Sequence, residues 1–197
     1  MEKKFYKKIY SHSDFYKALV LAFRSGKYFM SNRKKELISL QFRERIMLAV
    51  TEVNGCEACS YAHTKFALEE GMTIKEINAI LSGDTETIPG NELVGIFFAQ
   101  HYTDNNGKVS QKSWQRLIDE YDEESAMVIL AIIRIMNVGN IYGMAYSALC
   151  DRFKGKPSGK TSLFYEISIM LSILLYLPAA IIHAIFDNIR KKTIYPF

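Results

Sequence analysis

The stretch RERIMLAVTEVNGCEACSYAHTKFALEEGMT, residues 43–73, predicts two helices separated by a short turn. In a first helix over 35–53, apolar side chains recur every three or four residues, the spacing of one helical face. Asn54-Gly55 is a typical helix-breaking pair. A second helix over 56–70 follows. The stretch therefore predicts two consecutive helices, with two cysteines at the start of the second.

Helical patterns also account for the rest of the first 153 residues, since no segment shows the alternation of a half-buried strand. A capping box, TIKE, opens one short helix at residue 73. The hydrophobic content of 49% is enough for a packed core. The sequence predicts an all-α domain over residues 1–153, and its further helices cover 15–29, 73–81, 92–102, 110–121 and 124–153.

The C-terminal part of the chain differs in charge from the rest. Up to Asp151 the sequence has 18 basic and 19 acidic residues, and from Arg152 onward it has 7 basic and 2 acidic residues. Residues 154–162 have the composition of a linker, and 163–197 form an apolar, basic-flanked helical tail. Basic residues that flank an apolar run favour a membrane surface over nucleic acid, so we expect no nucleic-acid partner.

Within this tail, residues 167–186 carry no formal charge and are about long enough to span a bilayer. Pro178 in the middle favours a bent, shallow or re-entrant segment over a straight span. The same segment is also compatible with an apolar helix buried in an oligomer. The N-terminus lacks the apolar run of a signal peptide, so we expect a cytoplasmic protein. Membrane contact through 167–186 is one of the two interpretations of the tail.

The cysteines raise three chemical alternatives. Successive helical residues turn by about 100°, which places Cys56, Cys59 and His63 on one face. A Cys-x-x-Cys pair at a helix start can close a disulfide, and the helix N-terminus favours a thiolate. Zinc binding would require a fourth ligand from elsewhere, and the chain has no second Cys-x-x-Cys or His pair. The third alternative is a pair of buried structural cysteines beside a hydrogen-bonded histidine.

Residues 43–73 are similar to the signature of the carboxymuconolactone decarboxylase superfamily, in its AhpD-like alkylhydroperoxidase branch. The shared pattern is a glutamate twelve residues before the first cysteine, then Asn-Gly-Cys-x-x-Cys-x-x-x-His, then a glycine and a helix that begins at a threonine. The resemblance is dense over these residues and looser as far as residue 150. It implies an AhpD-like helical bundle, to which this chain adds the C-terminal apolar segment.

The resemblance also implies a role for each residue of the motif. Cys59 would be the peroxidatic thiol, and Cys56 would be both the proton donor and the resolving thiol that closes the disulfide. His63 would activate Cys59, and Glu44 would orient His63 or complete the proton relay. Glu52, four residues before Cys56, is the local competitor of Glu44. Some AhpD-like enzymes carry a histidine between the two cysteines, where this chain has a glutamate and an alanine.

The activity implied by this resemblance is thiol-dependent reduction of a hydroperoxide. The substrate would be a peroxide, the electron donor a lipoyl group or a thioredoxin-like protein, and no cofactor or metal would be needed. A non-enzymatic, membrane-associated redox sensor is the alternative. The decarboxylase chemistry of the superfamily acts without a cysteine pair, so the intact Cys-x-x-Cys argues against it.

Small residues near the end of the predicted 124–153 helix bear on assembly. Gly139, Gly143 and Ser147 are four apart, which lets a second helix approach closely. We interpret them mainly as packing residues, with a subunit interface as a further possibility, and we expect a homo-oligomer. Asn137 and Asn140 lie beside them, and we expect surface or capping roles for both, with buried polar partners as the alternative.

Overall fold

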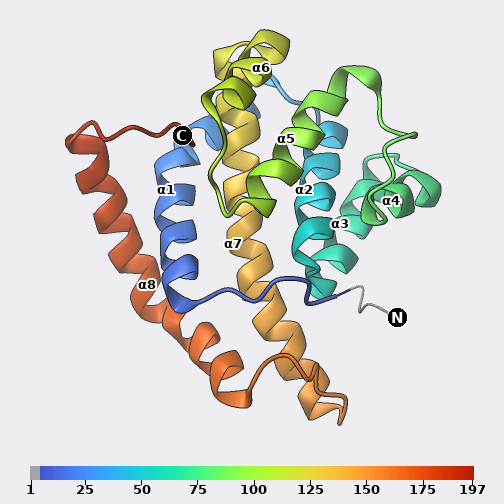
Figure 1. The fold of residues 1–197 in the computed structure, drawn as a ribbon, viewed down its shortest axis with the longest axis vertical. Coiled ribbons are helices and arrows are strands. Elements are labelled where there is room, and N and C mark those ends of the chain that lie inside the picture. The colour runs from blue at the N-terminus through green and yellow to red at the C-terminus, as the bar shows by residue number, and fades with distance from the viewer. Residues whose placement is uncertain (1–4) are drawn as a thin grey trace.

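The computed structural model describes residues 5–197 and confirms the all-α prediction, with no strand in this part of the chain (Figure 1). Eight α-helices and one short 3₁₀ helix follow one another within residues 5–197. They are α1 His12–Lys35, α2 Leu40–Asn54, α3 Glu57–Glu69, α4 Ile74–Leu81, η1 Gly90–Glu92, α5 Leu93–Asp104, α6 Gln111–Tyr121, α7 Glu123–Phe153 and α8 Leu163–Ile189.

The long helix α7 is the centre of the fold. It packs against α1, α2, α3, α5, α6 and α8, and Figure 1 shows it running through the middle of the bundle. Its segment 126–133 is buried without exception. By length and composition α7 is apolar enough to cross a membrane, yet 67% of its most apolar window is buried inside the molecule. α7 is therefore the core helix of this bundle.

The ends of the helices follow local capping chemistry. The capping box at residue 73 is confirmed, because Thr73 and Glu76 bond to each other's backbone N–H at the start of α4. The predicted 35–53 helix begins later than expected, at Leu40. α1 continues to Lys35, Glu36 adopts a left-handed conformation with φ 52°, and the Ser39 side chain caps the new helix. The amphipathic pattern alone did not separate these two helices.

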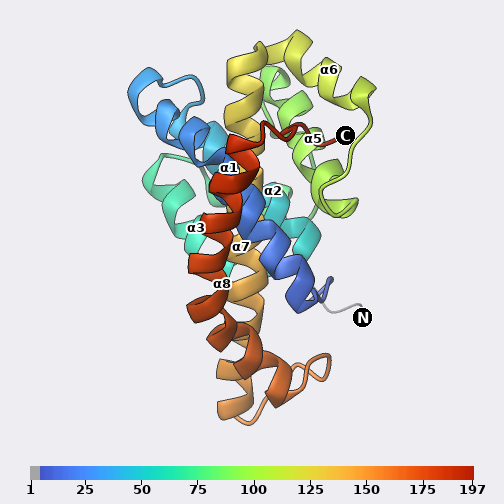
Figure 2. The same ribbon diagram turned by 90° about the vertical axis from the view of Figure 1, so that its left-hand side faces the viewer.

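Helix α8, the C-terminal apolar segment, packs along α1 and α7 and continues through Pro178 (Figures 1 and 2). The carboxylate of Glu166 is fully buried and accepts two hydrogen bonds of 2.8 Å from Arg152 of α7. Near the other end, buried Asp187 lies 3.9 Å from Arg24 of α1 and 2.5 Å from Lys192. Ion pairs thus attach both ends of α8, the first to α7 and the second to α1.

These acidic residues make the docking of α8 dependent on pH. Hydrogen bonds from Arg152 hold the pKa of Glu166 below its ordinary value, and the hydrogen bond from Lys192 does the same for the pKa of Asp187. Groups with lowered pKa values stabilise the fold at neutral pH, and this contribution is lost as the pH falls through about 4 and below. We therefore expect the amides of α8 to lose hydrogen-exchange protection in acid before those of α7.

The matched variant for this prediction is Glu166→Gln, which removes the charge and keeps the shape of the side chain. In this variant the backbone amides in the first turns of α8 should exchange hydrogen faster at neutral pH. Their exchange rates should also change less on acidification than those of the unmodified protein. Unchanged protection of α8 from pH 7 to about pH 3 would contradict the assignment of these pairs as anchors.

Candidate functional site

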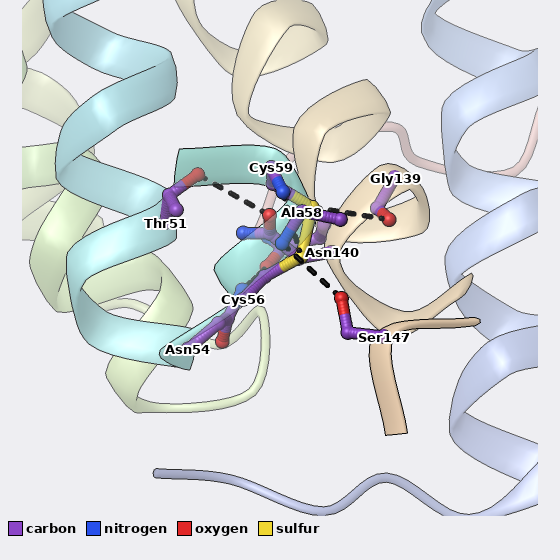
Figure 3. Close-up of a disulfide and its surroundings, with 9 residues drawn as sticks. Thr51, Asn54, Cys56, Ala58, Cys59, Gly139, Asn140 and Ser147 are labelled. Atoms are coloured by element: carbon purple, nitrogen blue, oxygen red, sulfur yellow. Dashed lines mark hydrogen bonds between the residues drawn. A yellow bond between two sulfur atoms is a disulfide. The ribbon is translucent and has the colours of Figure 1, made fainter. Parts of the chain in front are cut away.

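The two cysteines of the motif are joined in a disulfide at the start of α3 (Figure 3). α2 ends at Gly55, whose φ of +72° and close contact with Lys7 leave no room for a Cβ. Cys56 is the N-cap of α3, and Cys59 follows one turn later, with a Cα–Cα distance of 5.3 Å. The turn between the helices therefore fixes the backbone positions from which the disulfide forms.

Two N–H groups in the first turn of α3 have side-chain partners at the disulfide. The Cys59 N–H donates to Sγ of Cys56 at 3.2 Å, and the Ala58 N–H donates to Oγ of Ser147 at 3.2 Å (Figure 3). A sulfur that caps a helix lies where unpaired N–H groups carry partial positive charge. This position stabilises negative charge on Cys56 when the disulfide is opened.

The disulfide rests on the small residues of α7. A Cβ placed on Gly143 would lie 2.7 Å from Sγ of Cys59 and 2.9 Å from Sγ of Cys56. The Gly139 carbonyl oxygen is 3.5 Å from Sγ of Cys59, close enough for the reduced thiol to donate to it. The packing interpretation of these residues is thus confirmed for Gly143 and Ser147, and their partner is α3 of the same chain.

Asparagines and a threonine form a polar layer beneath the disulfide. Oδ1 of Asn140 accepts a hydrogen bond from Oγ1 of Thr51 at 3.2 Å, and Oδ1 of Asn137 accepts one from Nδ2 of Asn54 at 3.0 Å. Asn140 is fully buried, so the expected surface or capping role is wrong for it. Its Nδ2 has no hydrogen-bond partner among residues 5–197. The sequence pattern missed this layer because its members come from α2 and α7.

His63 and Glu44 are brought together by the packing of α3 against α2. Nδ1 of His63 is 2.7 Å from Oε2 of Glu44, and Oε1 of the same carboxylate accepts from Arg43 at 3.0–3.1 Å. Glu52, the alternative partner, instead pairs with Lys7 at 2.6 Å. Glu44 is almost fully buried, whereas the His63 side chain keeps 16% of its surface exposed. With Nδ1 bound to Glu44, Nε2 of His63 is the ring nitrogen left for a reacting group.

The two cysteines differ in access to solvent. Cys59 is 8% exposed and Cys56 is completely buried. A shallow hollow beside the motif is lined by Cys56 together with Lys7, Thr51 and Gly55, but it does not give the cysteine any exposed surface. A molecule arriving from solvent therefore meets Cys59 first.

Comparison with known proteins finds a family model that is similar to the part of the chain that carries this site. Residues 16–92 match the model of the carboxymuconolactone decarboxylase family, and the matched segment contains all four residues of the predicted site. The chain is also 27% identical over 114 residues to the uncharacterized protein YdfG of Bacillus subtilis (strain 168), an alignment that covers 57% of this chain and 78% of the relative. No solved structure matches it.

Metal-ligating side chains do not gather at this site in the described part of the chain. Among the described residues, no three His, Cys, Asp or Glu side chains come together in a way that could hold a metal ion. Cys56 and Cys59 bond to each other, and Nδ1 of His63 is bound to Glu44.

Two glycines of α7 provide a matched test of the packing at the disulfide. Replacing a helical glycine by alanine usually stabilises a protein by about 0.5–1 kcal/mol. We expect this gain for Gly139→Ala, because a Cβ there has no neighbour within 4 Å. For Gly143→Ala we expect the opposite sign, because the new methyl group would overlap both sulfurs.

Urea unfolding of the two oxidised variants measures both signs, and the thiol–disulfide equilibrium against a glutathione buffer measures the effect on the site. Gly143→Ala should shift this equilibrium and Gly139→Ala should leave it unchanged. Equal stabilisation by both substitutions would show that α7 is not in close steric contact with the disulfide at Gly143.

Proposed function

We propose that this protein is an AhpD-like thiol peroxidase, which reduces organic hydroperoxides by cycling Cys56 and Cys59 between dithiol and disulfide. The observation that carries the proposal is the combination of three features at one place: a disulfide at a helix N-terminus, a cysteine that is 8% exposed beside one that is fully buried, and a His63–Glu44 pair one turn away. A purely structural cysteine pair has no need of the buried carboxylate that holds His63.

In the first step the thiolate of Cys59 attacks the outer oxygen of the hydroperoxide. The S–O bond forms as the O–O bond breaks, so Cys59 becomes a sulfenic acid and the alkoxide takes a proton to leave as an alcohol. His63, held through Nδ1 by Glu44, supplies this proton from Nε2, which it took earlier from the Cys59 thiol. Glu44 acts as a positioning residue, since it reaches the reacting atoms only through His63.

In the second step Cys56 condenses with the sulfenic acid of Cys59. The S–S bond forms, the S–O bond breaks, and the hydroxide leaves as water with the proton of the Cys56 thiol. The hydrogen bond from the Cys59 N–H and the N-terminus of α3 stabilise the attacking thiolate of Cys56. The position of Cys56 as N-cap therefore favours the resolving role for this residue.

A dithiol donor then restores the reduced enzyme. Its thiolate attacks Cys59, the more accessible of the two cysteines, and displaces Cys56 as the thiolate that the helix N-terminus stabilises. The second donor thiol breaks the mixed disulfide and leaves with a disulfide of its own. Per cycle, one hydroperoxide and one dithiol become one alcohol, one water and one disulfide.

Phe66 favours an organic hydroperoxide over hydrogen peroxide. This side chain lies on the same face of α3 as Cys59 and His63, and its ring meets the ring of His63 edge to face at 5.7 Å. It is 46% exposed, so it presents apolar surface beside the more accessible of the two cysteines. An alkyl or aryl group can cover this surface while its peroxide oxygen approaches Cys59.

The roles of His63 and Glu44 are tested by conservative variants. General acid–base catalysis by a positioned side chain typically contributes about 10²–10⁴-fold, so His63→Gln should slow peroxide consumption by a factor in this range. Glu44→Gln keeps the shape of the pair and should cost less, with a changed pH–rate profile as the signature of positioning. Rates equal to those of the unmodified protein in both variants would remove the proton relay from the proposal.

Turnover distinguishes this enzyme from a redox sensor that oxidises once and signals through its disulfide. With cumene hydroperoxide and excess dihydrolipoamide, we expect continuous formation of alcohol in amounts that exceed the protein many times. Oxidation that stops after one equivalent, with dithiol still present, would favour the sensor.

A further inference from the structure

Helix α8 has its polar and apolar faces reversed relative to an ordinary surface helix. Its polar side chains Glu166, His183 and Asp187 face the bundle, where they contact Arg152, Tyr16 and Arg24. The outward face is continuous apolar surface from one end of the helix to the other and contains no charged side chain. Its residues are Phe164, Ile167, Leu171, Leu174, Leu175, Pro178, Ile182, Ile185, Phe186 and Ile189.

The extent of this outward face calls for a partner. Leu174 and Leu175 are 72% and 74% exposed, and only 17% of the most apolar window of α8 is buried. At 1.5 Å per residue the face is about 38 Å long. Soluble monomers rarely leave a contiguous apolar stripe of this size in water, because its hydration is unfavourable.

Basic side chains flank both ends of the same helix. Before it come Lys154, Lys156 and Lys160, and after it come Arg190, Lys191 and Lys192, all of them exposed. Apart from Glu166 and Asp187, which face inward in ion pairs, the chain beyond Arg152 has no acidic residue. The exposed surface at both ends of α8 is therefore positively charged.

We propose that the outward face of α8 lies flat on an anionic lipid bilayer, with its apolar side chains among the acyl chains and both basic clusters at the headgroups. A helix that crossed the bilayer would place the two clusters on opposite sides. It would also have to pull Glu166 and Asp187 away from the bundle or carry α1, with its exposed Lys17 and Lys27, into the hydrocarbon. An orientation in the plane of the membrane keeps every ion pair of α8 intact.

Charge favours lipid over a second copy of the chain as the occupant of this face. Two α8 helices packed face to face would bring basic clusters together whether they ran parallel or antiparallel, since both ends of the helix are basic. An anionic leaflet instead attracts each exposed lysine and arginine. The pattern of an apolar stripe with basic flanks is that of helices that bind the membrane interface.

This placement separates the membrane contact from the disulfide. α8 and α3 lie on opposite sides of α1 and α7 (Figures 1 and 2). The disulfide, which lies between α3 and α7, is therefore distant from the proposed lipid surface, and membrane binding does not require the peroxidase activity proposed above. α8 attaches the bundle to the membrane and leaves the Cys59 side of α3 open to soluble partners.

The test is flotation of the full-length protein with vesicles. We expect the protein to float with vesicles of phosphatidylglycerol and phosphatidylcholine, to bind pure phosphatidylcholine more weakly, and to dissociate as salt is raised. Leu174→Ser/Leu175→Ser should lose binding, and Lys154→Gln/Lys156→Gln/Lys191→Gln should weaken it about five-fold per charge removed. Leu40→Ser/Phe97→Ser, which removes exposed apolar side chains from other helices, is the matched control and should bind normally.

Sedimentation of the same proteins without lipid completes the test. The proposal is wrong if the unmodified protein does not float with anionic vesicles. It is also wrong if Leu174→Ser/Leu175→Ser floats to the same extent as the unmodified protein. If Leu174→Ser/Leu175→Ser instead converts a dimer into a monomer and vesicles bind neither, this face is an interface between two copies. Circular dichroism of each variant confirms that these surface substitutions leave the fold intact.

Discussion

Replacing Cys59 by serine is expected to abolish peroxide consumption, because this residue is the more accessible of the two cysteines and carries the proposed first step. A hydroxyl group cannot form the sulfenic acid, so the loss should be complete within the sensitivity of the assay. The loss of cumene hydroperoxide in the presence of dithiol measures it. Cys150→Ser is the matched control, since Cys150 is a free thiol outside the disulfide and should be dispensable.

Cys56→Ser should have a different effect from Cys59→Ser. The first step can still occur, but no neighbouring thiol resolves the sulfenic acid, so a dimedone-type probe should label Cys59 after one equivalent of peroxide. Labelling of Cys56 in the Cys59→Ser variant, together with continued peroxide consumption, would show that the two roles are reversed. The N-cap hydrogen bond at Cys56 makes this comparison informative, because that bond by itself favours a thiolate at Cys56.

Deleting residues 157–197 is expected to unfold the bundle or to reduce its stability severely. The deletion removes the carboxylate of Glu166 from Arg152, the backbone carbonyls of Lys192 and Thr193 from Arg24, and that of Ile194 from Arg134. Breaking one buried charged pair typically costs about 3–5 kcal/mol, and a domain has only about 5–15 kcal/mol in total. The apolar side of α1 would also lose its cover.

Thermal and urea unfolding of the truncated chain measure this effect. Leu174→Ser/Leu175→Ser is the control, because it changes α8 only on its outward face and should unfold at nearly the temperature of the unmodified protein. A truncated chain that keeps its stability and its Cys56–Cys59 chemistry would show that residues 163–197 are a separable tail.

The sequence predicted the parts of the structure that depend on local pattern. The helix start at Thr73, the break at Gly55 and the shared face of Cys56 and Cys59 follow from capping preferences, glycine and helical periodicity. Glu44 was different, since it lies off the apolar stripe of its helix and only the family resemblance singled it out. Its selection over Glu52 depends on how α3 packs against α2, which periodicity does not describe.

The rest of the site could not be read from the sequence because it is assembled from distant segments. Across more than 80 residues, Gly143 meets the two sulfurs and Ser147 meets the N–H of Ala58 between them. The buried position of Asn140 follows from the same packing. For α8, the uncharged segment 167–186 excludes Glu166 and Asp187, the acidic residues directly before and after it that anchor the helix. Glu166 and Asp187 lie on one helical face, and this spacing was the available signal that α8 turns a polar face inward.

The most direct measurement of the central claim is a single turnover of the fully reduced protein with one equivalent of cumene hydroperoxide. The account predicts that one molecule of alcohol forms for every two thiols lost. Mass spectrometry should then find the loss of two hydrogens on the peptide that carries Cys56 and Cys59, with Cys150 still a thiol. Hydroperoxide that persists beside the reduced protein, or oxidation that involves Cys150 in place of this pair, would contradict it.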